Sequence, residues 1–237
     1  MHISNVNNNY RVNWVTQSIE LLRSKTVRAN PTLFDIGAGM QPYRKIAQDA
    51  GFVYKSHDFT QYDPKNNENK SVGIHTIGWT YPKQDVVCDI LEIPTDEKFD
   101  LVICTEVLEH VPDPVSSLKK LFALAAEGGH VLITVPFGSM THQAPYFFSS
   151  GYSPQFFEYW CEKLGFEIVE LATYGDLVDA TTYQLKLLLD NILNFRFGRN
   201  LNKYIVKNFP RFRSRVPRHL NESFGFGVVF IGKKVRS

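Results

Sequence analysis

Short apolar runs alternate with segments of helical periodicity along most of this 237-residue chain. Runs of mostly apolar residues bounded by polar or glycine positions predict seven strands. These strands are expected at 33–36, 52–58, 85–90, 99–104, 130–136, 166–172 and 226–232. Helical spacing of apolar side chains predicts helices between them, at 42–50, 115–126 and 154–164. This alternation is typical of an α/β fold with a doubly wound, mostly parallel sheet.

Two segments lie outside this alternation. Residues 1–30 are polar and contain a short amphipathic helix at 12–22, which predicts an N-terminal helical extension. Residues 180–222 form an insertion before the last strand, with an amphipathic helix at 183–193 and a basic aromatic stretch at 195–218. No internal repeat separates these segments from the rest, so we expect a single domain over the whole chain.

The basic aromatic stretch interleaves cationic side chains with rings. Its members are Phe195, Arg196, Phe197, Arg199, Lys203, Tyr204, Lys207, Phe209, Arg211, Phe212, Arg213, Arg215 and Arg218. Four interpretations are open: a lid over a phosphorylated or nucleotide-linked acceptor, a peripheral contact with an anionic membrane, a nucleic-acid surface, or a solvated insertion or dimer contact. Its place before the last strand favours the lid.

Composition narrows the class of protein. The formal net charge is +2 at pH 7, so the chain is no polycation and no nucleic-acid partner is expected. Cys88, Cys104 and Cys161 stand apart, without the spacing of a zinc site or a disulfide framework. The sequence also lacks a signal-peptide pattern and an apolar stretch long enough to span a bilayer. These features predict a cytoplasmic protein, and we expect no metal site.

The chemistry begins at the turn after the first strand, Gly37-Ala38-Gly39, which Asp35 precedes. Glycines let the backbone pass close to a ligand, and the helix that follows points its amide groups at that ligand. Pro42 stands where a dinucleotide-binding turn has its third glycine or alanine, which argues against NAD or FAD. The turn also lacks the lysine of a phosphate-binding loop, which argues against ATP.

Further candidate residues follow the later strands. Asp58 ends the second strand, where a carboxylate can accept both hydroxyls of a ribose. Asp89 and Ile90 end the third strand and suit the amine and the ring face of an adenine, and the alternative for Asp89 is a cap of the turn after it. Cys104 ends the fourth strand, and Glu106 follows it. Ligands of open α/β sheets bind at these carboxyl ends, so the pattern predicts an adenosyl site.

These motifs together resemble class I S-adenosylmethionine-dependent methyltransferases. The resemblance covers residues 30–175 and includes Glu106-Val107-Leu108-Glu109-His110-Val111 after the fourth strand. It implies a Rossmann-like methyltransferase fold with an antiparallel last strand at 226–232 and S-adenosylmethionine as cofactor. It also implies that the 37–39 turn lines the methionine part of the cofactor. Cys104 and Glu106 would then lie near its sulfonium, and Tyr43 or Arg44 near its carboxylate.

The methyl acceptor has to lie at the same edge of the sheet, where residues 136–146 follow the fifth strand. His142 is the first candidate for a catalytic base because imidazole titrates near neutral pH, and His110 is the second. Tyr146 and Tyr152 are expected to contact the acceptor. For His142, a role in positioning the substrate or closing the site is an equal alternative. For Glu109 and His110, the alternative is the start of a helix.

Residues 142–154 resemble methyltransferases of bacterial surface-glycan and nucleotide-sugar pathways. That resemblance implies O-methylation of a sugar, a nucleotide-sugar or a glycan precursor. Other candidate activities are methylation of a quinone or a lipid headgroup, methylation of RNA, and cofactor binding without catalysis. Cys104-Thr105-Glu106-Val107 stands where enzymes that methylate a base nitrogen carry Asn/Asp-Pro-Pro-Tyr/Phe, which disfavours RNA.

Overall fold

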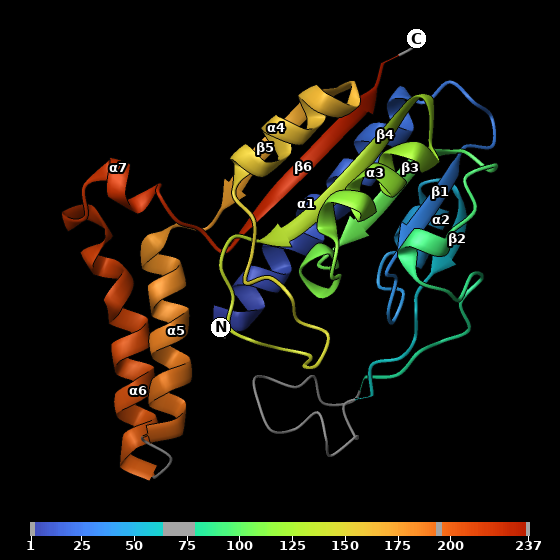
Figure 1. Ribbon diagram of the computed structural model, residues 1–237. Helices are drawn as coiled ribbons and strands as arrows, with labels where there is room; N and C mark the ends of the chain where they lie inside the picture. Colours follow the sequence, from blue (N-terminus) through green and yellow to red (C-terminus); the bar gives the residue numbers. More distant parts are fainter. Residues whose placement is uncertain (1–2, 64–78, 193–195, 236–237) are drawn as a thin grey trace.

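The computed structural model describes residues 3–63, 79–192 and 196–235, which include a six-stranded sheet in the order β2-β1-β3-β4-β6-β5 (Figure 1). The strands are β1 (Thr32–Ile36), β2 (Val53–His57), β3 (Phe99–Thr105), β4 (Ala125–Pro136), β5 (Phe166–Tyr174) and β6 (Gly227–Lys234). β1 to β4 run parallel, and β6 runs antiparallel between β4 and β5. The predicted α/β fold with an antiparallel last strand is confirmed.

Helices cover both faces of the sheet. One apolar layer lies under α3 (Pro114–Leu124) and α4 (Pro154–Leu164), and the other lies under α1 (Ile3–Lys25) and α2 (Arg44–Asp49). Neighbouring strand residues alternate between the layers, so that Phe34 packs in the first and Leu33 in the second. Burial on both faces explains why β3 and β4 read as continuous apolar runs.

The start of α3 shows how local sequence positions an element. The carboxylate of Asp113 accepts a hydrogen bond from the Ser116 amide at 2.9 Å, and Pro114 occupies the first turn, where no donor is lost. Leu118 and Leu121 are then buried on one face. The helix ends at Leu124, and β4 begins at the next residue.

The predicted third strand at 85–90 is absent from the sheet in the described part of the chain. Val86 forms a single isolated bridge with His57, and a short 3-10 helix, η2 (Ile90–Glu92), follows. The carboxylate of Asp85 accepts from the backbone and hydroxyl of Ser56, each at 2.9 Å. The Ser56 amide is then no longer available to the backbone of a neighbouring strand, so pairing stops after one bridge.

The helix predicted at 115–126 ends earlier, at Leu124, and Glu127-Gly128-Gly129 lies in the strand that follows. Both glycines lie within β4, and Gly128 has φ 76°. The pairing of β3 with β4 shifts register at this point, because Phe99 pairs with Ala125 and Leu101 pairs with His130. A glycine with positive φ is therefore used in a strand irregularity rather than in a helix end.

The insertion between β5 and β6 is helical, as predicted. It contains α5 (Leu177–Ile192), α6 (Arg196–Asn208), the 3-10 helix η4 (Phe209–Arg215) and α7 (Arg218–Asn221). α5 and α6 form a hairpin that projects from the sheet (Figure 1). The side chains of Phe195, Arg196, Phe197 and Arg199 lie outside the described residues. Within the described residues, no helix combines the length and the apolar character needed to cross a bilayer.

Candidate active site

The turn after β1 brings the backbone close to two neighbouring side chains. Gly37 and Gly39 have φ 69° and 51°, in the region that favours glycine. A Cβ at Gly37 would lie 2.3 Å from the side chain of Val107, and one at Gly39 would lie 2.8 Å from Trp79. Both positions therefore require glycine for space as well as for conformation.

Two buried carboxylates support this turn. Asp58 accepts hydrogen bonds from the amides of Gly39 at 2.9 Å and Thr60 at 2.8 Å. Asp35 lies behind the turn and accepts from the hydroxyl of Tyr54 at 2.7 Å. Burial raises the pKa of Asp58, and it raises that of Asp35 to about 7 despite the hydrogen bond from Tyr54.

A cavity of about 580 Å³ lies beside the turn, at the carboxyl ends of the parallel strands. Many ligand pockets have this size. The predicted site residues that line it are Gly37, Ala38, Gly39, Asp58, Glu106, His110, His142 and Tyr146. The turn and the histidines therefore share one cavity, although Gly37 and His142 are 105 positions apart in the chain.

Other predicted site residues do not line this cavity. Asp89 is exposed, and its carboxylate accepts from the Leu91 amide at 2.8 Å, which caps η2. Ile90 and Cys104 are buried in the apolar layer under α3 and α4. The hydroxyl of Tyr152 donates to the carbonyl of Leu108 at 2.8 Å, which holds the end of the β4–α4 connection against 3-10 helix η3 (Leu108–His110).

Glu106 is held in place by two contacts. Its carboxylate pairs with the guanidinium of Arg11 from α1 at 3.0 Å and accepts from the hydroxyl of Thr134 on β4, also at 3.0 Å. Its φ of 55° lies in the left-handed region, as does the φ of 52° at Gln143. Both residues line the cavity. Uncommon backbone conformations of this kind often mark functional sites.

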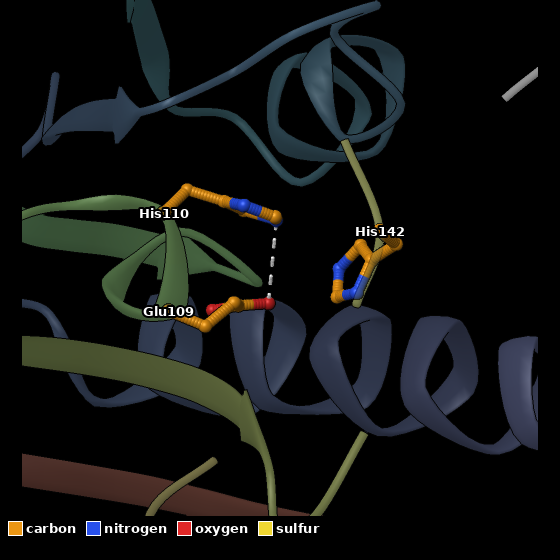
Figure 2. Close-up of side chains that lie close together, drawn as sticks. All are labelled: Glu109, His110 and His142. Carbon is orange, nitrogen blue, oxygen red and sulfur yellow. Dashed lines mark ion pairs between the residues drawn. The ribbon is translucent and has the colours of Figure 1, made fainter. Parts of the chain in front are cut away.

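His110 and His142 both line the cavity, with ring centroids 4.7 Å apart and nearly perpendicular planes (Figure 2). His110 ends η3, whereas His142 lies in the connection between β4 and α4. Burial lowers the pKa of His110 to about 4, so its ring is neutral near pH 7. The fully buried Glu109 lies next to both histidines.

Residues 14–171, more than half of the chain, match a family model described as a methyltransferase domain. The chain belongs to that methyltransferase family. The resemblance to class I S-adenosylmethionine-dependent methyltransferases, which rested on the glycine turn and the strand ends, is thereby confirmed.

Curated relatives of this methyltransferase include the ubiquinone biosynthesis O-methyltransferases of Stutzerimonas stutzeri and Ralstonia nicotianae, at 28% and 26% identity over 129 residues. These matches cover 54% of this chain and 50% and 49% of the relatives. The chain thus spans about half the length of the curated relatives that it matches.

Solved structures share the fold of this methyltransferase. A SAM-dependent methyltransferase from Archaeoglobus fulgidus matches with a TM-score of 0.52 at 16% identity, covering 91% of this chain and 94% of that chain. The magnesium protoporphyrin IX methyltransferase of Synechocystis, solved with bound SAM, matches with a TM-score of 0.50 at 12% identity. It covers 93% of this chain and 78% of that chain.

The methyltransferase cavity also contains residues that sequence reasoning missed. Arg11, Phe59, Trp79, Tyr81 and Tyr183 line it. Aromatic residues in the otherwise polar 60–84 loop were a usable signal for Trp79 and Tyr81. Arg11 carried no signal, because its role depends on the packing of α1 across β3. Tyr43 lines the cavity as well, but Arg44 does not and instead bonds to Gln41 and Asp85.

Proposed function

We propose that this chain transfers a methyl group from S-adenosylmethionine to an oxygen atom of a small-molecule acceptor. One observation carries the proposal: a single cavity joins the Gly37–Gly39 turn and Asp58 to the histidines His110 and His142. Methyl transfer from a sulfonium is an in-line displacement, so the enzyme has mainly to hold donor and acceptor in line. The two ends of this cavity suit those two tasks.

The donor belongs at the turn. The Asp58 carboxylate accepts from the amides of Gly39 and Thr60 on different oxygens, and its remaining lone-pair capacity can accept a ribose hydroxyl. The turn backbone would face the methionine part, and Glu106 would lie near the positive sulfonium. Phe59, Trp79 and Tyr81 line the same cavity and provide flat surfaces for the adenine. Asp89 and Ile90, which the sequence predicted to bind the adenine, do not line the cavity. We therefore propose that they support the adenine site from behind the lining residues.

For the acceptor, we propose a hydroxyl of a sugar, a nucleotide-sugar or a glycan precursor, which would place the enzyme in polysaccharide biosynthesis. The acceptor end of the cavity mixes rings with polar groups, Tyr146 and Tyr183 beside Gln143, Gln184 and Ser139. Sugars need this combination, because hydroxyl groups need hydrogen-bond partners and their apolar faces stack on rings. Tyr152 would act indirectly, by holding the connection that contains His142.

A phenolic precursor of a quinone is the second candidate acceptor. The curated relatives are named ubiquinone biosynthesis O-methyltransferases, and the cavity has several aromatic side chains. A phenol is more acidic than a sugar hydroxyl, so it needs less help from a base. Single-turnover assays with phenolic and sugar acceptors would separate the two candidates, since only the correct class should give a methylated product.

The insertion supports an acceptor-binding role, because Ala180, Tyr183 and Gln184 of α5 line the cavity. The basic aromatic stretch that follows α5 remains a candidate for peripheral contact with an anionic membrane. We also propose a cytoplasmic location. Cys88, Cys104 and Cys161 are all free thiols, as is usual in a reducing compartment.

Calorimetry with S-adenosylhomocysteine, the product of the donor, tests the proposed function. We expect saturable binding to the purified full chain. Absence of binding at millimolar ligand would remove the proposed cofactor and with it the activity. Binding without turnover on any acceptor would instead favour a cofactor-binding module without catalysis.

His142 is the first candidate for the base that accepts the proton of the acceptor. The His142→Ala variant is expected to lose most of its turnover and to retain its affinity for S-adenosylhomocysteine, because the histidine lies at the acceptor end. His219→Ala, on exposed α7, is the matched control and should remain fully active. Full activity of His142→Ala would eliminate its role as base and leave His110 as the candidate.

A further inference from the structure

Glu109 is a buried carboxylate next to two histidines of the cavity wall. Its side chain is fully buried, and neither carboxylate oxygen has a hydrogen-bond partner among the described residues. An isolated carboxylate in such a place is costly unless a proton or a cation compensates its charge. Burial accordingly raises the pKa of Glu109 well above its usual range. Methyl transfer as proposed above gives this carboxylate no task.

Two imidazoles lie next to that carboxylate. One ligand atom each from Glu109, His110 and His142 lies within 4.8 Å of the others, and the Nε2 atom of His110 is 3.7 Å from Oε1 of Glu109. Figure 2 shows His110 and Glu109 side by side, with the ring of His142 across from them. The three side chains converge from η3 and from the β4–α4 connection.

In both histidine rings, the hydrogen bond at Nδ1 leaves Nε2 as the nitrogen that can bind a metal ion. Nδ1 of His110 lies 2.5 Å from the carbonyl oxygen of Tyr146, and Nδ1 of His142 lies 3.0 Å from that of Met140. A backbone carbonyl can only accept, so in the neutral rings Nδ1 carries the proton and Nε2 has a free lone pair. Histidines that bind metals commonly donate their other N–H to a carbonyl in this way.

We propose that Glu109, His110 and His142 form a binding site for one divalent transition-metal ion, with Zn²⁺ as the best match. Two imidazoles and one carboxylate suit zinc, whereas Mg²⁺ and Ca²⁺ favour oxygen ligands. Zinc bonds to such ligands are about 2.0–2.2 Å long, so the three atoms must move closer together when the ion binds. His142 lies in the connection between β4 and α4, so this movement does not require a helix or a strand to shift at that residue.

Three protein ligands leave one coordination position for a ligand from the cavity, which His110 and His142 both line. This step rests on the proposed function. A hydroxyl of the acceptor bound there would have a lowered pKa and would release its proton to solvent. Its oxygen would then bond to the methyl carbon as the carbon–sulfur bond breaks, which gives the methyl ether and S-adenosylhomocysteine. In this arrangement His142 is a ligand rather than a free base.

Titration of the full chain with zinc chloride after treatment with a chelator tests the site. The Cys88→Ser background removes the half-buried thiol as a competing ligand. We expect one equivalent to bind, with about tenfold or more weaker affinity in Glu109→Gln and in His142→Ala and unchanged affinity in His219→Ala. Because His142 lies in a connection, its variant is expected to fold even if the buried Glu109→Gln variant does not. Unchanged zinc affinity in His142→Ala would overturn the proposal.

Calorimetry with S-adenosylhomocysteine on the same samples separates this inference from the proposed function. Binding of the adenosyl ligand without stoichiometric zinc binding would reject the metal site and leave the methyltransferase proposal intact. Zinc binding without adenosyl binding would support the metal site and reject the proposed function. If both bind, turnover lost with the chelator and restored by zinc would support the ligand role of His142, whereas full turnover of the zinc-free enzyme would reject the catalytic role of the metal.

Discussion

Three carboxylates, Asp35, Asp58 and Glu109, are buried at or near the carboxyl ends of β1, β2 and β3. Burial raises the pKa of each, because water no longer stabilises its charge. They differ in their partners: Asp58 accepts two amides, Asp35 accepts one hydroxyl and Glu109 has no hydrogen-bond partner within the described structure. These differences predict distinct behaviour when each side chain is changed.

Removal of the Asp58 carboxylate is expected to weaken cofactor binding. In Asp58→Ala, the Gly39 amide loses its acceptor and the ribose loses its proposed partner, so affinity for S-adenosylhomocysteine should fall by at least about tenfold, or about 1.4 kcal/mol. Calorimetry measures this change. Asp96→Ala, at an exposed loop carboxylate, is the control and should bind like the parent chain. Equal affinity in both variants would remove Asp58 from the ribose site.

Asp35 is expected to make stability depend on pH. Its pKa is about 7 in the folded chain and about 3.9 when unfolded, so folding favours the protonated form. Its contribution is therefore fully present below about pH 4 and is lost as the pH rises through about 7. The free energy of unfolding of the parent chain should fall relative to that of Asp35→Asn across this range. Urea unfolding at several pH values measures the difference, and parallel pH profiles would contradict the assignment.

At the scale of elements, distant segments meet at the cavity through a few polar contacts. α1 is tied to the sheet by the Arg11–Glu106 pair and by Trp14, whose indole donates to Glu170 on β5 at 2.8 Å. The start of α5 is tied to η4 by Arg213, which pairs with Asp176 at 2.6 Å and with Asp179. α1 and α5 thus carry side chains from opposite ends of the chain to one site.

Tyr183 tests whether α5 belongs to the acceptor site. Its ring packs edge-on against Phe226, with centroids 5.9 Å apart, and it lines the cavity. Tyr183→Ala is expected to raise the KM for the acceptor several-fold, because a stacking surface worth about 1 kcal/mol is lost, while affinity for S-adenosylhomocysteine stays the same. Tyr204→Ala, at a ring on α6 that is 68% exposed, is the matched control. An unaltered KM in Tyr183→Ala would remove α5 from the acceptor site.

For the whole molecule, charge is unevenly distributed. The net charge is only +2, yet Lys203, Lys207, Arg211 and Arg215 are exposed within α6 and η4. Tyr204 and Phe212 are also exposed there. α6 belongs to the hairpin that projects away from the sheet (Figure 1), and η4 follows it in the chain. Cationic and aromatic groups together suit an anionic membrane surface.

Vesicle flotation tests this contact. We expect the chain to bind vesicles with anionic lipid and to be released as salt is raised, because each cation near the surface contributes about 1 kcal/mol that salt screens. The Lys203→Glu and Lys207→Glu double variant should bind at least about tenfold more weakly. Lys119→Glu with Lys163→Glu makes the same charge change on α3 and α4. Similar binding by both double variants would mean that α6 is not the membrane surface.

The candidate site was predictable from the sequence to different degrees. The Gly37–Gly39 turn, Asp58 and His142 could be chosen because local rules apply to strand ends and glycine turns. Asp89 and Cys104 obey the same rules, yet one caps η2 and the other packs in the core. A position after a strand does not determine which way a side chain points. Arg11 and Tyr183 could not be chosen at all, since tertiary packing alone brings α1 and α5 to the cavity.

The amino-acid sequence by itself determined the alternation of strands and helices apart from the expected third strand, the α/β class and the resemblance to methyltransferases, because periodicity and turn chemistry act over a few residues. Only the tertiary structure decided that the sheet described here has six strands, since Asp85 accepts a hydrogen bond from the distant Ser56 amide and pairing ends at one bridge. Only the tertiary structure also brought Glu109, His110 and His142 together. The physical reason is the same in both cases: burial and long-range contacts determine which polar groups find partners.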